Sequence, residues 1–126
     1  MESVIARLRI RKPKKGTISD GEIIFIDPVP DQHQIFDVTD SSSVVAEPIV
    51  IKSGATFRFP GEVQFVSIVY SGSAFISTES DESKFKIMTP VYLHNGKISN
   101  NDTNRIKIGF VLDGGVRCDR ILVDRS

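Results

Sequence analysis

The side chains of this chain that could do chemistry are few: the single cysteine, Cys118, and two histidines, His33 and His94. A catalytic cysteine needs a general base and a group that stabilises an oxyanion, and the sequence assigns neither to Cys118. Asp31 lies two residues before His33, which is half of a metal-ligand set, but no second pair follows at ligand spacing. We therefore expect solvated loop histidines, a cysteine that fills a strand position, no metal site and no cofactor.

Sequence motifs of catalysis and phosphate binding point the same way. Gly114 and Gly115 lie between two strand-like runs, with no helix whose N-terminus could bind an anion. There is no G-x-S-x-G, H-E-x-x-H or Walker pattern. The glycine- and aspartate-centred motifs of trimeric β-fold nucleotidohydrolases, an enzyme class of similar length, are missing too. The sequence predicts a protein that is not an enzyme and has no catalytic residues.

Length and composition predict one folded domain without covalent cross-links. A chain of 126 residues with 40% hydrophobic and 25% charged residues can bury a core of its own. One cysteine excludes an intramolecular disulfide. The N-terminus lacks the apolar segment of a secretory signal, and no apolar run approaches the ~20 residues that cross a bilayer. We expect a soluble protein, made in the cytoplasm and not bound to a membrane.

Charge is balanced overall but unevenly distributed. Sixteen basic and sixteen acidic residues cancel, so the net charge does not favour a polyanionic partner. The first fifteen residues contain six cations and one acidic residue, Glu2, whereas acidic residues outnumber basic ones from Gly16 to Glu62. These charges could be neutralised within the fold or between neighbouring copies. The six cations are the candidate partner-binding residues: Arg7, Arg9, Arg11, Lys12, Lys14 and Lys15.

The elements that position these residues are predicted to be strands. Apolar and basic residues alternate from Ala6 to Arg11, which is typical of a half-buried strand. The short apolar run 23–26 suits a strand buried on both faces. Residues 63–76 fit two strands or one long bent strand. Asn95-Gly96 between two apolar runs predicts a type I′ hairpin, and a second hairpin is expected around 113–115.

These patterns predict an all-β fold with one domain over residues 16–126 and a basic N-terminal strand or arm over residues 1–15. No apolar stripe at helical spacing extends for three turns. Strands with turn signals every ten or so residues favour a small antiparallel β-sandwich, a jelly roll or a barrel-like domain. Pro90 predicts that residues 85–93 form two short strands or a sheet edge.

Two binding functions compete with a purely structural one. The basic N-terminus could bind nucleic acid through phosphates, but no aromatic residue interleaves with it to stack bases, so nucleic acid is not the expected partner. Aromatic side chains could instead form a sugar-binding face, although strand positions of this kind usually pack in a core. The candidates for such a face are Phe57, Phe59, Tyr70 and Tyr92.

Four runs between residues 89 and 123 form one ordered pattern. A strand-like run, Thr89–Leu93, leads to a turn of the NGK kind at Asn95–Ile98, then Ile108–Leu112 has the form IGF-apolar-Leu, and Arg120–Val123 follows as a last apolar strand. This order resembles the C-terminal portion of small bacteriophage capsid decoration (cement) and head-stabilising proteins. The segment Ile51–Ile76, with its SGATF turn and strand, also resembles β-rich modules of phage structural proteins.

The resemblance implies a non-enzymatic virion protein. Such proteins are usually homotrimers that sit on the capsid surface, where capsomers meet, and tie neighbouring subunits of the major capsid protein together. A multivalent clamp of this kind strengthens a shell held by many modest interfaces. The protein would be synthesised in the host cytoplasm and assembled onto the virion. The alternative among phage proteins is a carbohydrate- or receptor-binding module of a phage tail or fibre.

Overall fold

The structure is a computed structural model that describes residues 3–80, 85–100, 106–113 and 118–124, and in this part of the chain it contains strands and no helix. The predicted all-β class is therefore confirmed. No described segment has the helical length and apolar character of a membrane span. The strands are β1 Val4–Arg11, β2 Gly16–Ile18, β3 Ile23–Ile26, β4 Ile35–Thr39, β5 Glu47–Ser53, β6 Ala55–Phe57, β7 Val63–Phe75, β8 Pro90–His94, β9 Lys97–Ser99, β10 Ile106–Val111 and β11 Arg120–Val123.

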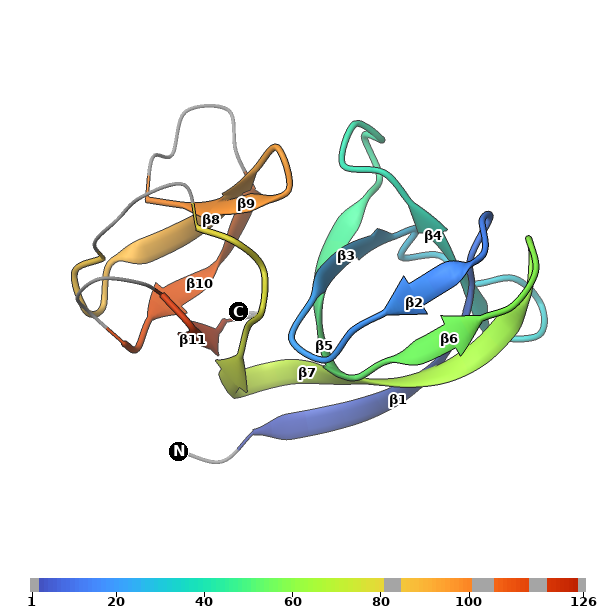
Figure 1. Cartoon of the computed structure of the whole chain (residues 1–126), viewed down its shortest axis with the longest axis horizontal. Coiled ribbons are helices and arrows are strands. Elements are labelled where there is room, and N and C mark those ends of the chain that lie inside the picture. The colour runs from blue at the N-terminus through green and yellow to red at the C-terminus, as the bar shows by residue number, and fades with distance from the viewer. Residues whose placement is uncertain (1–2, 81–84, 101–105, 114–117, 125–126) are drawn as a thin grey trace.

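The first half of the chain closes into a small barrel. The strand order is β1-β4-β3-β5-β7, and β1 also pairs with β7, so the sheet has no free edge there (Figure 1). The β1–β4 pair is parallel and the other four pairs are antiparallel. The ribbon of β2 and β6 is a separate sheet that adds Ile18 and Phe57 to the barrel core. Of the three architectures expected from the sequence, the barrel-like one describes this lobe.

The second half forms an antiparallel sheet that begins on the barrel's own strand. β7 is one long strand: its first part closes the barrel, and residues 72–75 pair with β11, which continues the order β11-β10-β8-β9. Gly72 separates the two parts and has φ +101°, a backbone conformation that residues with a Cβ rarely adopt. Figure 1 shows the resulting C-terminal sheet lying beside the barrel.

Two apolar clusters meet at the barrel wall. One fills the barrel, and the other lies between the barrel and the C-terminal sheet. In β3, Ile24 and Ile26 face the first cluster while Ile23 and Phe25 face the second. All four residues of this strand are buried, as the continuous apolar run predicted.

The Asn-Gly hairpin is also present as predicted. β8 and β9 pair through it, and Asn95 and Gly96 have φ values of +51° and +75°, both positive as a type I′ turn requires. β10 and β11 form the second expected pairing, with its turn outside the described residues at 114–117. Pro90 proved compatible with a central strand: β8 pairs with β10 and β9, and Pro90 is its first residue, where a missing N–H is tolerated.

The basic N-terminus is a strand and not a detached arm. β1 pairs along its length with β7 and, at its end, with β4, and the Ile10 side chain is fully buried in the barrel. Residues 12–15 connect β1 to β2. Residues 4–11 thus supply one strand of the barrel, and the division into residues 1–15 and 16–126 stays a prediction.

Candidate interaction surfaces

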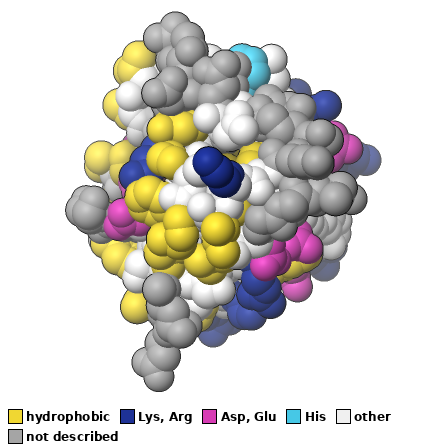
Figure 2. Space-filling model, turned by 90° about the vertical axis from the view of Figure 1, so that its left-hand side faces the viewer, with side chains coloured by type: hydrophobic (Ala, Val, Ile, Leu, Met, Phe, Trp, Pro, Cys, Tyr) yellow, Lys and Arg dark blue, Asp and Glu magenta, His cyan; other side chains and the backbone are white. Residues whose placement is uncertain are grey.

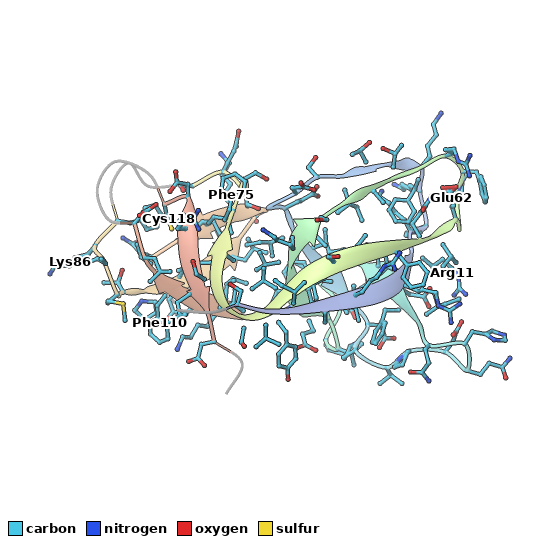
Figure 3. All side chains as sticks on the ribbon, turned by 90° about the horizontal axis from the view of Figure 1, so that it is seen from below. Arg11, Glu62, Phe75, Lys86, Phe110 and Cys118 are labelled. Atoms are coloured by element: carbon cyan, nitrogen blue, oxygen red, sulfur yellow. The ribbon has the colours of Figure 1, made fainter. Side chains whose placement is uncertain are left out.

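The three arginines of β1 lie on one side of the strand, as the alternation predicted, and each has a contact within the barrel lobe. The Arg7 guanidinium carbon lies 4.1 Å from the ring centroid of Phe65, a cation–π contact. Arg9 donates a hydrogen bond to the backbone carbonyl of His33. Arg11, labelled in Figure 3, binds two carboxylates at the end of β1. The three arginine side chains therefore already contact groups of this chain, which leaves them only partly available to a partner.

Arg11 is the most firmly engaged of these arginines. Its Nη2 lies 3.0 Å from Asp31 Oδ2 and its Nη1 lies 2.9 Å from Asp37 Oδ1. Asp31 also accepts backbone hydrogen bonds from Ile35 and His33. The bond from Ile35, together with the Arg11 guanidinium, lowers the pKa of Asp31 below its usual value. For Arg11, neutralisation within the fold is what the structure shows.

The lysines of the basic set are arranged differently. Lys14 and Lys15 are exposed in the connection between β1 and β2, and Lys12 is half-buried. The Lys12 backbone is fixed by hydrogen bonds to Glu62 and from Gly61. Lys14 and Lys15 therefore present their charge to solvent at one end of the barrel, and a role for the set in binding a partner stays a prediction.

Glu62 is a buried carboxylate at the same end of the barrel. Its side chain is 5% exposed and accepts hydrogen bonds from the backbone N–H of Arg58 at 2.7 Å and from Arg58 Nε at 3.0 Å. The backbone bond is the main cause that lowers the pKa of Glu62. Because its hydrogen bonds fix the turn before β7, Glu62 has a structural role.

Neither histidine lies in a reactive cluster. His33 is exposed between β3 and β4, and His94 ends β8 next to the hairpin turn, where its ring contacts the Asn95 side chain. Among the described residues, no three histidine, cysteine or acidic side chains are grouped to hold a metal. Cys118 lies in the core between barrel and sheet, and burial raises its pKa to about 11. A thiol with this pKa is a poor nucleophile at neutral pH.

The four aromatic residues proposed for a sugar-binding face do not share a face. Phe57 is 1% exposed and belongs to the barrel core. Phe59 and Tyr70 are exposed but belong to the segment after β6 and to β7, while Tyr92 is half-buried in β8 of the C-terminal sheet. The arrangement offers no stacked aromatic platform from these residues.

An exposed apolar face lies at the far end of the C-terminal sheet. Figure 2 shows hydrophobic side chains gathered at this end of the molecule. Ile87 and Met88 are more than half exposed there. Lys107 Nζ lies 4.0 Å from the ring centroid of Phe110, on the adjoining strand β10. Small isolated apolar residues are ordinary on a surface, and this face is notable for its position opposite the charged end of the barrel.

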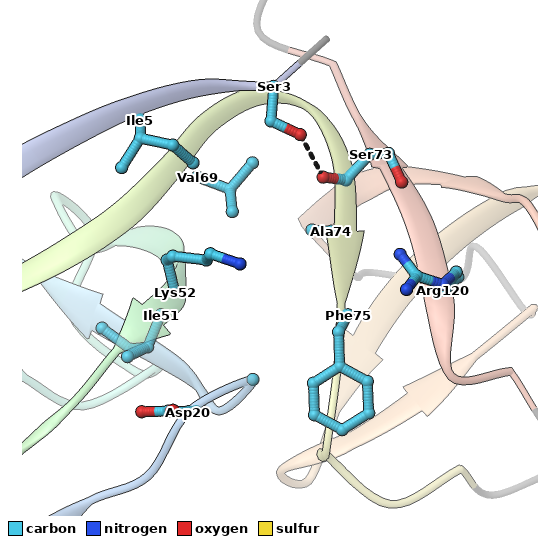
Figure 4. Close-up of a pocket in the computed structure, with 11 residues that line it drawn as sticks. Ser3, Ile5, Asp20, Ile51, Lys52, Val69, Ser73, Ala74, Phe75 and Arg120 are labelled. Atoms are coloured by element: carbon cyan, nitrogen blue, oxygen red, sulfur yellow. Dashed lines mark hydrogen bonds between the residues drawn. The ribbon is translucent and has the colours of Figure 1, made fainter. Parts of the chain in front are cut away.

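A groove lies where the barrel and the C-terminal sheet meet (Figure 4). Its volume is about 600 Å³, within the ~300–1,000 Å³ of common ligand sites. Ile51, Lys52 and Val69 lie on one wall, and the last part of β7 with Arg120 lies on the other. No sequence motif marks this groove. Its one local signal is Ser71-Gly72-Ser73, the polar interruption at which β7 passes from barrel to sheet.

Comparison with known proteins finds similarity in fold. No protein-family model matches this chain, and no curated protein matches its sequence. The solved structure titled "The crystal structure of head fiber gp8.5 N base in bacteriophage phi29" superposes with a TM-score of 0.60 over 98% of this chain and 97% of that chain. The two chains share a fold. Their sequences are 10% identical, so the likeness concerns architecture and not individual site residues.

Proposed function

We propose that this chain is a structural protein of a bacteriophage head, which acts by binding other virion proteins and catalyses no reaction. The observation that carries the proposal is the fold shared with the phi29 head fibre base over nearly the full length of both chains. A barrel with an attached sheet matches end to end, so the likeness is not that of one common hairpin. The motif resemblance at residues 89–123 is an independent argument for the same class of protein.

The chemistry of the described side chains supports a binding role. The buried Cys118 has a pKa raised to about 11 by burial, which disfavours the reactive thiolate. Arg11 forms ion pairs with Asp31 and Asp37, and Glu62 forms one with Arg58. These ion pairs lie within the barrel lobe and have a structural role. Recognition would then depend on surface shape and on the cations that remain exposed.

The proposed partner is the major capsid protein, bound on the outer surface of the head where neighbouring subunits meet. Lys14 and Lys15 at the end of the barrel, together with Arg7, are the exposed cations of the basic set and would meet carboxylates of the capsid. A homotrimer would place three such contacts on adjacent subunits, and linked contacts bind far more tightly than single ones.

The test is binding of the purified chain to tail-less heads from the phage whose genome encodes it. We expect co-sedimentation at a fixed ratio to the major capsid protein, and electron cryomicroscopy should place the chain at capsomer junctions. Light scattering after size-exclusion chromatography should give three times the 14.0 kDa chain mass. A chain that ignores these heads, or whose gene lies outside any phage genome, contradicts the proposal.

Charge-reversal variants test the proposed contact. The double variant Lys14→Glu/Lys15→Glu should weaken head binding at least tenfold, and Lys86→Glu, which changes an exposed lysine in the other half of the chain, should not. Circular dichroism and thermal unfolding would verify that both variants stay folded. Equal binding by both variants would show that Lys14 and Lys15 do not contact the head. Whether the chain binds heads at all is decided by the sedimentation experiment.

The tail or fibre module remains the second candidate because the phi29 protein is named as the base of a head fibre. A receptor-binding module would be present at a few copies at a tail tip and would bind host-surface glycans. Immunogold labelling of whole virions distinguishes labels spread over the head from labels at one tail tip. A glycan array with the purified chain gives an independent result.

A further inference from the structure

The last part of β7 has one paired edge and one open edge. Toward β11, residues 72–75 form a regular antiparallel ladder, and the Ile76 N–H continues it by donating to Asp119 at 3.0 Å. Backbone groups of alternate residues in a strand point to opposite edges, so the N–H and C=O groups of Ser73 and Phe75 point away from β11. That is the side on which the groove lies (Figure 4).

Both ends of this open edge are fixed by hydrogen bonds. At one end the Ser3 hydroxyl donates to the Ser73 carbonyl. At the other end the Ser77 N–H donates to the Gly21 carbonyl at 2.8 Å, and the Ser77 hydroxyl donates to the Asp20 carbonyl at 3.0 Å. Between these brackets, the Ser73 N–H and the Phe75 N–H and C=O have no hydrogen-bond partner in the described part of the chain.

The charge of the groove is positive. Lys52 is exposed, its ammonium points across the groove toward β7, and it makes no ion pair with a described carboxylate. Arg120 stands on the opposite wall, next to Phe75 in the ladder. Asp20 is the acidic side chain of the lining, and its carboxylate is directed away and accepts the Gly54 N–H at 2.7 Å.

Apolar side chains complete the lining. Ile5 and Phe75, each about half exposed, are the apolar side chains that the groove offers to a ligand, whereas Ile51 and Val69 beneath it are buried. In β-strand addition, an extended peptide pairs with an open sheet edge through its backbone while alternate side chains enter pockets on the receptor. The groove has the three elements of such a site: an open strand edge, exposed apolar side chains at its margins and a cation on each wall.

We propose that this groove binds an extended segment of a partner protein as a short strand beside Ser73–Phe75, with an acidic side chain of that segment between Lys52 and Arg120. The two cations and the absence of a free carboxylate among the described lining residues specify the charge of the segment. Apolar side chains next to its acidic residue would contact Ile5 and Phe75, the exposed apolar residues of the lining. The inference stands apart from the head assignment, because it rests on the groove alone.

A library of random nonapeptides is a suitable probe, since the partner's sequence is not specified by the structure. Panning against the purified chain should enrich peptides with aspartate or glutamate at a fixed position and apolar residues at alternate positions beside it. A synthetic copy of the enriched peptide should shift the backbone amide resonances of Ser73 and Phe75 and slow their hydrogen exchange. Neither amide has a hydrogen-bond partner among the described residues, and both would become bonded when the peptide pairs with the edge.

N-methylated peptides test the strand geometry directly. One version carries methyl groups on the alternate backbone nitrogens that face β7, and the other carries them on the intervening nitrogens. Only one of the two should lose binding, by a hundredfold or more, because a paired edge strand uses every second N–H. Equal loss, or no loss, in both versions would overturn strand addition even if the peptide binds in the groove.

The protein variant that tests the charge is Lys52→Glu, which reverses an exposed cation. It should weaken the selected peptide at least tenfold, and Lys86→Glu should bind it unchanged. The far-ultraviolet spectrum and thermal midpoint of each variant show whether the fold is intact. Failure to enrich any peptide, or enriched peptides that bind Lys52→Glu as well as the original chain, would overturn the proposal. Binding of heads by this variant would leave the proposed function untouched.

Discussion

The backbone carbonyl of Gly21 accepts a hydrogen bond from the Ser77 N–H at 2.8 Å, and this bond ties the turn between β2 and β3 to the segment that leaves β7. The Gly21 N–H donates in turn to Ile51 of β5, also at 2.8 Å. Gly21 has φ +81°, and a Cβ at this position would lie 2.7 Å from the Ser77 nitrogen and 2.8 Å from the Phe75 ring. This position therefore requires glycine for two separate reasons, the positive φ and the lack of space for a Cβ.

The variant Gly21→Ala should destabilise the chain through both effects. A left-handed φ costs a non-glycine residue on the order of 1–3 kcal/mol, and the steric clash with backbone adds to that cost. Gly61→Ala is the matched control, because Gly61 has nearly the same φ, +80°, and a Cβ added there would meet no atom within 4 Å. Urea unfolding should show a clearly larger loss of free energy for Gly21→Ala. Equal losses would mean that the turn moves freely away from β7.

Much of the fold was predictable because the local patterns agree with the pairing. The run at β3 predicted burial on both faces, and each face of that strand does contact a different core. The Asn95-Gly96 turn was predictable from local sequence, because asparagine and glycine adopt positive φ more readily than other residues. Barrel closure was not predictable, because β1 contacts β4 and β7, which are far from it in sequence and from each other.

The site was predictable only in part for the same reason. Alternation placed Arg7, Arg9 and Arg11 on one side of a strand, but nothing local indicated that Asp31 and Asp37 would neutralise Arg11. The groove depends on where β7 passes from barrel to sheet, and no residue spacing records which of its edges stays open. Sequence patterns specify faces of strands, and edges are specified by the tertiary arrangement.

Asp31 should make the stability of the barrel sensitive to acid. Its folded-state pKa is lowered below the ordinary 3.8, first by the Ile35 backbone hydrogen bond. A lowered carboxyl pKa means that the stabilisation is fully present above the ordinary value and is lost as the pH falls through the folded-state value. Asp31→Asn should therefore unfold at lower urea than the original chain at pH 7.

The difference between the two proteins should shrink as the pH falls below about 3.8, where the carboxylate of the original chain also becomes protonated. Urea unfolding of both proteins at a series of pH values measures it. Asp27→Asn serves as the comparison, because Asp27 is a carboxylate of the same β3–β4 connection that makes no described ion pair. A difference that stays constant with pH would contradict a lowered pKa of Asp31 in the folded chain.

Asp113 should have the opposite effect on stability. A hydrogen bond with the Asp119 side chain is the first cause that raises its pKa above the ordinary 3.8. The folded chain therefore holds this proton more tightly than the unfolded chain, and stability falls as the pH rises from the ordinary value through the raised one. Asp119→Asn removes the repulsion between two carboxylates and should raise the unfolding midpoint at pH 7.

Asp124→Asn is the control for this pair, since it removes one negative charge from the adjoining end of the chain without altering the Asp113–Asp119 contact. Thermal unfolding at pH 7 and at pH values below 4 would compare the three proteins. The gain from Asp119→Asn should be present at pH 7 and smaller in acid. A similar gain from Asp124→Asn would assign the effect to net charge and not to the pair.

Cys118 should be unreactive in the folded chain. The side chain is 3% exposed, lies in the core between barrel and sheet, and has a pKa raised to about 11 by burial. Thiolate is the reactive form, so both its low population and its inaccessibility slow attack on a disulfide reagent. Ellman's reagent at pH 8 should report less than a tenth of a thiol per chain over minutes without denaturant, and one thiol in urea. Full reaction before unfolding would show that the C-terminal sheet separates from the barrel, and the groove beside β7 would then not be a fixed site.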